Sequence, residues 1–379
     1  MKILIAPDSF KGSISSTEAA RIIESAVKTV SDDIRTRTFP MADGGEGTVD
    51  AILLGTGGHR IVKEVRDPLG RPIQAALGWM PEERTAVIET AAASGLPLLA
   101  REELDPLSCT TFGTGELILE ALNLGAETIV LGLGGSATVD CGTGIFEALG
   151  ARFIDSGGQV LNSPGGKLGS IAEIDTSALD PRLGSTNIVV ASDVTNPLLG
   201  KDGAVHVFGP QKGVTAELLV PMENDMAHFA RVVSAHTGRD ETDTPGSGAA
   251  GGIGFLLRSL LSVTFRPGIE LIMETSGFTD ALPEADLMIT GEGRVDGQSL
   301  FGKVPAGIGR LAKQHGIPTA ALAGSIGSGI EALEEHGVCV VHPIVSGPIS
   351  LEEAMNNAES LLFESAVRLI KTIRLMPKQ

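Results

Sequence analysis

The sequence contains no tyrosine and one tryptophan among its 379 residues, and its aromatic content is only 3%. It also lacks a basic block, because 29 lysines and arginines are scattered among 47 acidic residues to give a formal net charge of −18. Such a surface repels nucleic acid and anionic membranes, and single-strand binding needs aromatic platforms that are missing here. We therefore expect neither a nucleic-acid partner nor a membrane partner.

Cysteine and long apolar runs are equally scarce. Cys109, Cys141 and Cys339 are odd in number and far apart, which predicts neither a disulfide framework nor a zinc or redox motif. The histidines lack H-x-x-x-H spacing, which excludes the usual helical zinc pair. The apolar stretch ILIAP after Lys2 is too short for a signal peptide, and no membrane-spanning run follows. These absences predict a cytoplasmic protein.

Glycine is abundant instead, with 49 residues in short clusters beside apolar runs and no collagen-like period. Glycines in this arrangement suit tight turns and close approaches between the backbone and a ligand. A chain of this length is also too long for one ordinary core, so two domains are expected.

Strand and helix alternate at both ends of the chain. Residues 1–7 read as a buried strand, and Ser15 and Glu18 form an S-x-x-E capping box before a helical run. Another strand is predicted at 285–290, and Ser350 begins a final long amphipathic helix. Alternation of strand, loop and helix predicts a parallel sheet, and only the two ends together supply enough strands for one.

The middle of the chain has a different pattern. Residues 61–90 alternate apolar and polar side chains across short turns, as an antiparallel meander does. We therefore predict a two-domain α/β protein: residues 1–64 plus 281–379 form one α/β domain, and residues 65–280 form an inserted mixed α/β domain. A cleft between domains commonly holds an active site, so we expect it there.

Residues 129–155 contain a G-x-G-x-x-A pattern at Gly132, Gly134 and Ala137, followed by Asp155 at a distance that suits a ribose-binding acid. This pattern makes an NAD-dependent dehydrogenase one hypothesis. A lone glycine fingerprint is weak, however, and Asp155 followed by Ser-Gly-Gly reads equally well as a hairpin turn.

Five further glycine-rich loops carry charged or amide side chains near predicted strand ends, where open α/β sheets bind ligands. They supply Asp8, Ser9 and Lys11; Asp43, Gly44, Gly45 and Glu46; Asp193 and Asn196; Lys212; and the long loop 290–305. Any one of these acids alone is more often a turn-former. Together they favour phosphoryl transfer, which needs backbone donors, a cation, metal-binding carboxylates and an acid that accepts a hydroxyl proton.

The loop 290–305 resembles a phosphate loop up to its last position. Gly297, Gly302 and Lys303 fit G-x-x-x-x-G-K, but Val304 stands where Ser or Thr would hold magnesium. Lysine beside backbone N–H groups suits phosphate, and carboxylates suit Mg²⁺. The same loop supplies Glu292, Arg294 and Asp296.

Taken in order, several blocks resemble the bacterial type I glycerate kinases over essentially the whole chain. They are APDSFKGSISSTEAA, ADGGEGTVDA, ETAAASGLPLL, TTFGTGELI, GLGGSATVDCGTG, ASDVTNPLLG, FGPQKG, GSGAAGGIG and ITGEGRVDGQS-xx-GKVP. One departure is visible: Cys141 follows Asp140 where the family commonly has glycine.

The resemblance implies an ATP-dependent, Mg²⁺-requiring kinase that phosphorylates D-glycerate, usually at the 2-hydroxyl to give 2-phosphoglycerate. It also implies a flavodoxin-like domain made from both chain ends, and it makes the glycine segment a loop of the inserted domain. By this likeness, the dinucleotide match is fortuitous.

Roles of single residues are hypotheses that neither spacing nor resemblance decides. Asp193 is the candidate base for the glycerate hydroxyl, with Asp8 and Asp43 as alternatives, at a rate contribution of about 10²–10⁴. Candidates for neutralising phosphate or the glycerate carboxylate are Lys11, Lys212 and Lys303. Glu292 and Asp296 are the magnesium candidates. Further candidates for binding substrate or phosphate are Ser9, Gly44, Gly45, Glu46, Gly134, Gly135, Ser136, Asp140, Asn196, Arg294 and Gly302.

Two other hypotheses stay open beside the kinase: the NAD-dependent dehydrogenase and a non-catalytic sugar-acid binding protein. The sequence also leaves open a homodimer, the domain that holds the nucleotide, and the choice between 2- and 3-phosphorylation.

Overall fold

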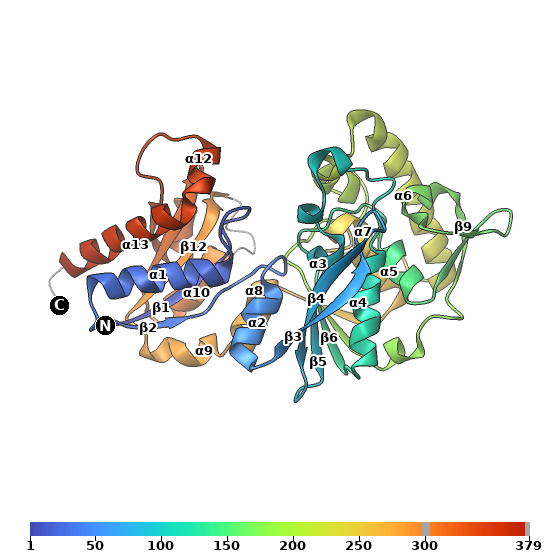
Figure 1. The fold of residues 1–379 in the computed structure, drawn as a ribbon. Helices are drawn as coiled ribbons and strands as arrows, with labels where there is room; N and C mark the ends of the chain where they lie inside the picture. The colour runs from blue at the N-terminus through green and yellow to red at the C-terminus, as the bar shows by residue number, and fades with distance from the viewer. Residues whose placement is uncertain (298–303, 376–379) are drawn as a thin grey trace. The chain divides into compact units, whose positions relative to one another are not determined.

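The computed structural model describes residues 1–297 and 304–375, which belong to two compact units (Figure 1). The first unit comprises Met1–Asp43, Asp50–Thr56 and Pro267–Gln379, and the second comprises Gly44–Val49 and Gly57–Arg266. The chain crosses between units after Asp43, Val49, Thr56 and Arg266, whereas the sequence analysis expected junctions after residues 64 and 280.

The first unit is built on a five-stranded parallel sheet in the order β14-β13-β12-β1-β2. Its strands are β1 (Lys2–Pro7), β2 (Arg35–Thr38), β12 (Leu287–Val295), β13 (Thr319–Ile326) and β14 (Val338–Pro343). In order of appearance along the chain this is 2-1-3-4-5, the flavodoxin-like arrangement. The predicted parallel sheet from both chain ends is therefore confirmed.

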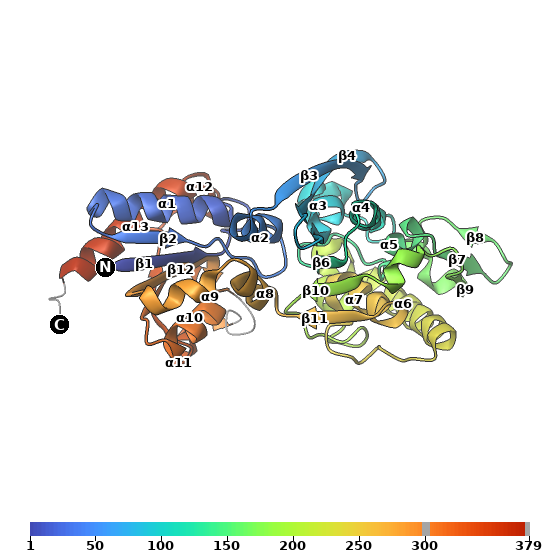
Figure 2. The same cartoon turned by 90° about the horizontal axis from the view of Figure 1, so that it is seen from below.

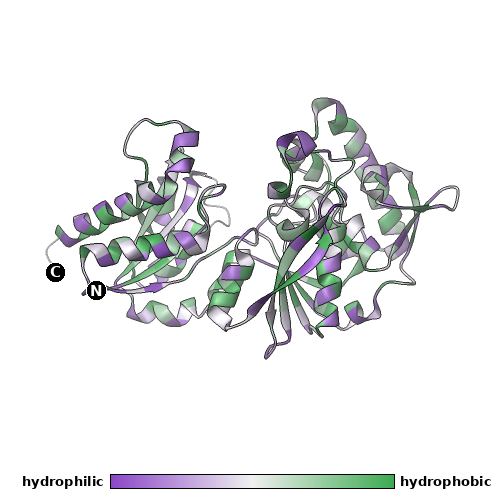
Figure 3. Cartoon of the chain, in the orientation of Figure 1, coloured by the Kyte–Doolittle hydropathy of each residue, from purple (hydrophilic) through white to green (hydrophobic). Residues whose placement is uncertain are grey.

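Helices cover both faces of this sheet. α1 (Ser16–Val30) and α13 (Ala358–Leu375) pack together on one face, and α10 (Val304–Gln314) and α11 (Ala332–Glu335) lie on the other (Figure 2). α1 and α13 are striped with apolar and polar residues, as helices on a buried sheet must be (Figure 3). The remaining helices are α2 (Thr48–Thr56), α8 (Gly268–Thr275), α9 (Phe278–Ala281) and α12 (Leu351–Asn356).

Two predictions about elements near the C-terminus were wrong in extent. β12 does not end at residue 290 but runs to Val295, because its backbone pairs with β13 as far as Ile326. The final helix is also interrupted at Asn357, whose side-chain amide donates to the Glu353 carbonyl and so competes with the helical backbone bonds. The predicted cap at Ser350 is confirmed: its hydroxyl accepts from the Glu353 N–H at 3.1 Å.

The second unit contains a six-stranded mixed sheet in the order β11-β10-β6-β5-β4-β3. Its strands are β3 (His59–Arg66), β4 (Pro72–Met80), β5 (Thr85–Glu89), β6 (Thr128–Gly132), β10 (Asn187–Ala191) and β11 (Val263–Arg266). The antiparallel pairs are β3–β4 and β4–β5, which confirms the meander predicted at 61–90. The other pairs in this sheet are parallel.

A smaller antiparallel sheet in the order β8-β7-β9 and several helices complete the second unit. These elements are β7 (Arg152–Asp155), β8 (Val160–Leu161), β9 (Ile171–Asp175), α3 (Thr90–Ser94), α4 (Phe112–Asn123), α5 (Thr143–Ala148), α6 (Ala216–Thr237) and α7 (Ala249–Leu260). No helix in the described part of the chain is long and apolar enough to cross a membrane.

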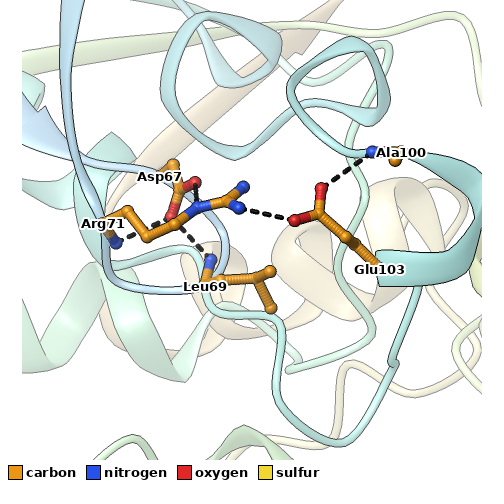
Figure 4. A network of polar contacts seen from close by, with 5 residues as sticks. All are labelled: Asp67, Leu69, Arg71, Ala100 and Glu103. Carbon is orange, nitrogen blue, oxygen red and sulfur yellow. Dashed lines mark hydrogen bonds and ion pairs between the residues drawn. The ribbon is translucent and has the colours of Figure 1, made fainter.

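The turn between β3 and β4 is held by a charged network (Figure 4). The Asp67 carboxylate, 1% exposed, accepts from the backbone N–H groups of Leu69 and Arg71 and from the Arg71 guanidinium. Arg71 also pairs with Glu103 at 2.6 Å, and Glu103 accepts from the Ala100 N–H at 2.9 Å. Every acid in this network has a donor, so its role is structural.

Candidate functional site

Three predicted acids and one lysine gather within the first unit; we call Asp8, Asp43, Glu292 and Lys11 the acidic cluster. Asp8 and Lys11 follow β1, and Glu292 lies near the carboxyl end of the neighbouring strand β12. Lys11 Nζ lies 3.7 Å from an Asp43 carboxylate oxygen. Parallel strands bring their carboxyl ends to one edge, which is why residues almost 300 positions apart in the chain meet here.

The carboxyl of Asp8 is 4% exposed and stands among like charges. Its pKa is raised from 3.8 to about 8, chiefly by burial and also by the nearby carboxylates of Asp43 and Glu292. Lys11 and the Ser9 N–H, which donates to Asp8 at 2.6 Å, act in the opposite direction. The pKa of Lys11 is raised, chiefly by Asp43. A buried carboxyl that titrates near neutrality marks a functional-site candidate.

A pocket of about 340 Å³ opens beside this cluster. Its polar side is lined by Asp8, Ser9, Lys11, Glu292 and Arg294, all of which the sequence singled out. The structure thus brings together residues from the first and the last of the predicted loops, within one unit.

The magnesium candidates Glu292 and Asp296 do not converge. Glu292 lies within β12 and Asp296 directly follows its end, so the backbone between them is extended and their Cα atoms are about 13 Å apart at ~3.3 Å per residue. Asp296 instead accepts from Arg294 Nε at 2.8 Å. One Mg²⁺ with ligands about 2.1 Å away cannot contact both carboxylates directly. The sequence analysis expected one glycine-rich loop over residues 290–305, whereas β12 continues to Val295.

Two other predicted residues of that loop, Gly302 and Lys303, lie outside the described residues. Within residues 1–297 and 304–375, no three His, Cys, Asp or Glu side chains are arranged to hold a metal ion.

In the second unit, the predicted glycine loops pack on each other. Gly134 donates its N–H to the Gly44 carbonyl at 3.1 Å, and a Cβ on Gly134 would lie 2.5 Å from the Cα of Gly45. A Cβ on Gly132 would lie 2.4 Å from the Gly44 oxygen. These glycines therefore allow two backbones to touch, and the Gly134 N–H predicted to face an anion is engaged with protein.

The same geometry removes the basis for the dinucleotide fingerprint. No helix begins directly after Gly134, since α5 starts only at Thr143, so the turn is not the strand–turn–helix that the dinucleotide fingerprint requires. Asp155 accepts from the N–H groups of Gly157 and Gln159 in the β7–β8 hairpin. It is a turn residue.

Lys212 is only 2% exposed, and its ammonium is held by the loop of residues 134–138. Nζ donates to the Thr138 carbonyl at 2.8 Å and to the Ser136 hydroxyl at 3.4 Å. Burial lowers the pKa of Lys212 to about 7, against the opposing effect of Asp140. Ser136 is itself 4% exposed, so both predicted phosphate ligands lie below the surface.

Asp140 is fully buried and surrounded by donors. Its carboxylate accepts from the N–H groups of Thr111, Gly142 and Gly144 at 2.8, 3.0 and 3.2 Å, and from the Thr111 hydroxyl at 2.7 Å. The next residue, Cys141, has a φ of +55°, a left-handed conformation that favours glycine. This explains why glycine suits that position better than cysteine.

The remaining candidates of the second unit lie in loops that follow β10, precede α2 or follow β6. Asp193 and Asn196 follow the carboxyl end of β10 and are half-buried, and the Asn196 amide donates to the Asp202 carbonyl at 2.8 Å. Glu46 is exposed, beside Gly45 in the loop before α2. Gly135 adopts a φ of +77° and accepts from the Leu96 N–H at 2.9 Å.

Sequence reasoning missed the apolar side of the pocket. Ile344 and Val345 follow β14, and Leu351 and Met355 lie one turn apart on α12. The i, i+4 spacing of Leu351 and Met355 was visible in the sequence, but it is equally typical of a core-facing helix. Only the structure shows that Leu351 is 77% exposed.

Comparison with known proteins identifies the relatives of this chain. Residues 3–374 match the model of the glycerate kinase family. The chain is 45% identical over 375 residues to the glycerate kinase of Bacillus subtilis, covering 99% of this chain and 98% of that protein. It is 42% identical over 373 residues to the glycerate 2-kinase of Escherichia coli K12, covering 98% of each.

The fold agrees with these sequence matches. The crystal structure of a Salmonella typhimurium LT2 protein assigned as glycerate kinase 2 superimposes with a TM-score of 0.83 at 42% identity. The match covers 99% of this chain and 98% of the other.

Proposed function

Because the chain belongs to the glycerate kinase family, we propose that it transfers the γ-phosphoryl group of ATP to the 2-hydroxyl of D-glycerate, giving 2-phosphoglycerate and ADP. The chain is an enzyme of that family, and ATP-dependent phosphorylation of glycerate is its activity. The 2-position agrees with the description of the Escherichia coli relative as a glycerate 2-kinase.

The acidic cluster is the observation in the structure that supports this chemistry best. Phosphoryl transfer requires cations and metal-binding carboxylates close together at a strand end, with little covalent chemistry from the protein. Lys11 and the buried Asp8 line one pocket, and Asp43 pairs with Lys11 beside it. Neither the dehydrogenase nor the binding-protein hypothesis needs buried acids that repel one another.

The Mg²⁺ requirement is part of the proposal. Asp8, Asp43 and Glu292 offer carboxylate oxygens, the ligands Mg²⁺ prefers, although they form no three-residue cage. This fits an ion held by one or two carboxylates, with water and substrate phosphates as its other ligands. When bound, Mg²⁺ would neutralise charge on the transferred phosphoryl group. We propose Glu292 together with either Asp8 or Asp43 as its protein ligands, in place of the pair Glu292 and Asp296.

Asp193 remains the proposed base, with Asp8 and Asp43 as the alternatives, and Lys11 is proposed to neutralise phosphate. We infer that Lys212 holds the loop of residues 134–138 and that Asp140 holds the backbone at Thr111 and Gly142, rather than that either contacts phosphate, since both are buried and occupied by protein groups. A cytoplasmic location, where ATP is supplied, and D-glycerate as the small-molecule partner complete the proposal, which leaves a homodimer open.

The product is tested by ³¹P NMR of purified protein with Mg²⁺, ATP and D-glycerate. A 2-phosphoglycerate signal is expected. A 3-phosphoglycerate signal would correct the position, and intact ATP at high enzyme concentration would refute the activity.

The base is tested by comparing Asp193→Asn with Asp8→Asn. Replacing the true base by asparagine should lower the kcat of the enzyme about 10²–10⁴-fold. Asp202→Asn, at an exposed position near Asn196, is the matched control and should retain activity. If Asp193→Asn were folded and retained near-normal turnover, Asp193 would not be the base, and Asp8 or another acid would be.

A further inference from the structure

The pocket of the first unit has two chemically different ends. One end is charged and consists of Asp8 and Lys11 after β1, with Glu292 and Arg294 on β12. The other end is apolar. It is lined by Ile344, Val345, Leu351, Ala354 and Met355.

The charged end lies where the connectivity of the sheet reverses. In the order β2-β1-β12, the chain leaves β1 to one side for β2 and returns to its other side for β12. Loops therefore separate at the carboxyl ends of β1 and β12, and ligands of open α/β sheets bind in the crevice at this point. Asp8 and Lys11 follow the first of these strands, and Glu292 lies near the end of the second.

The apolar end needs a ligand with an apolar surface. Leu351 is 77% exposed and Met355 is 37% exposed, although both are large hydrophobic side chains on one short helix. Ile349, just before that helix, is 38% exposed. Clustered exposed apolar side chains beside polar groups are typical of a binding surface. Glycerate, a three-carbon hydroxy acid, has almost no apolar surface to place there, whereas ATP carries a purine ring.

We propose that this pocket is the ATP site, with the purine against Leu351, Ala354 and Met355 and the phosphates toward Lys11 and Arg294. The two ends of the pocket then match the two ends of the nucleotide. A volume of about 340 Å³ lies within the range of small-molecule sites, about 300–1,000 Å³. This assignment rests on the proposed function for the identity of the two substrates, and it places the nucleotide in the flavodoxin-like unit.

The test is direct nucleotide binding by calorimetry on the full-length protein, with Mg²⁺ and without glycerate. Leu351→Gln removes apolar contact at an exposed position, and Ala354→Phe fills the pocket. Leu375→Gln is the matched control, because Leu375 is 84% exposed in the same unit and does not line the pocket. Thermal unfolding checks that each variant is folded.

Loss of one apolar contact to the purine should raise the Kd for ATP about tenfold in Leu351→Gln, with a larger loss in Ala354→Phe. The control should bind as the wild type does. Inorganic tripolyphosphate, which lacks the purine, should bind wild type and Leu351→Gln equally. This last probe separates the apolar end of the pocket from the charged end.

Unchanged ATP affinity in both folded pocket variants would overturn the assignment, as would a higher KM for glycerate with ATP binding unaltered. A wild-type protein that binds no ATP would also overturn it. Because the experiment measures binding, its result is independent of turnover. If the pocket variants bound ATP more weakly but the wild type formed no phosphoglycerate, the ATP site would be supported and the proposed reaction refuted.

Discussion

The two units carry charged groups that are built in opposite ways. In the second unit, Asp140 is buried and saturated by backbone donors, and Lys212 is buried and held by the Thr138 carbonyl. In the first unit, Asp8 is equally buried but shares its surroundings with Asp43 and other acids, and its pKa rises to about 8. Buried charge that is fully hydrogen-bonded shapes a loop, whereas buried charge facing like charge is kept for a ligand.

This difference separates residues that look alike in sequence. Asp8 and Asp140 are both aspartates in glycine-containing loops, and each is followed directly by a small residue. Their environments differ because one faces backbone N–H groups and the other faces a pocket. Substitutions in both units test this difference between the environments of Asp8 and Asp140.

Asp140→Ala should have the largest effect on stability. It leaves three buried N–H donors without their acceptor, which costs at least about 3 kcal/mol of unfolding free energy. Urea unfolding measures the loss. Asp155→Ala is the control, because it removes two similar bonds from a hairpin turn open to solvent and should cost much less. If Asp140→Ala left the free energy of unfolding unchanged, the saturated hydrogen bonding of Asp140 would not distinguish the two units.

Asp8→Asn should stabilise the metal-free protein at high pH. The pKa of Asp8 is raised from 3.8 to about 8 on folding, so its stabilising contribution is full below about pH 4 and is lost as pH rises through 8. Asparagine does not ionise, so the variant should be more stable than wild type above pH 8, by a few kcal/mol at ~1.4 kcal/mol per pKa unit. The difference should vanish toward pH 4. Thermal melts across this range measure it, and a pH-independent difference would contradict the electrostatic account.

Lys212→Met should show a smaller effect with the opposite pH dependence. Burial lowers the pKa of Lys212 from 10.5 to about 7. Between these two pH values Lys212 is protonated in the unfolded chain but neutral in the folded protein, so the stability of the wild type increases as the pH rises. Methionine does not titrate. The Tm of the variant relative to wild type should therefore fall as pH rises from 7 to 10, and a constant difference would show that Lys212 is not desolvated. Loss of the bond to Thr138 offsets part of the gain at low pH.

Glu103→Gln should have the smallest effect. Glu103 pairs with Arg71 at the surface of the network in Figure 4, where solvent screens the ion pair. The Tm should not change measurably. A clear loss of stability would show that this network depends on its exposed member and not on the buried Asp67.

Local patterns in the sequence were sufficient for much of the fold. The N-cap half of the box predicted at Ser15 is present, since its hydroxyl accepts from the Glu18 N–H at 3.2 Å, although the Glu18 carboxylate pairs with Arg21. The meander at 61–90 forms as predicted. Both depend on residues close in sequence, whose hydrogen bonds and alternation act over a few positions. The extent of β12 was not predictable in this way, because pairing with β13 decides it.

The sequence by itself determined the family, the parallel and antiparallel regions, and the chemical types needed for phosphoryl transfer, because motifs and periodicity are local. Only the tertiary structure decided which of those residues meet. Asp8 and Glu292 lie on neighbouring strands although the inserted unit separates them in sequence, while Glu292 and Asp296, four positions apart, are held about 13 Å from each other at ~3.3 Å per residue. Strand pairing brings distant residues together and keeps extended neighbours apart, and burial then decides which charged groups shape loops and which face a pocket.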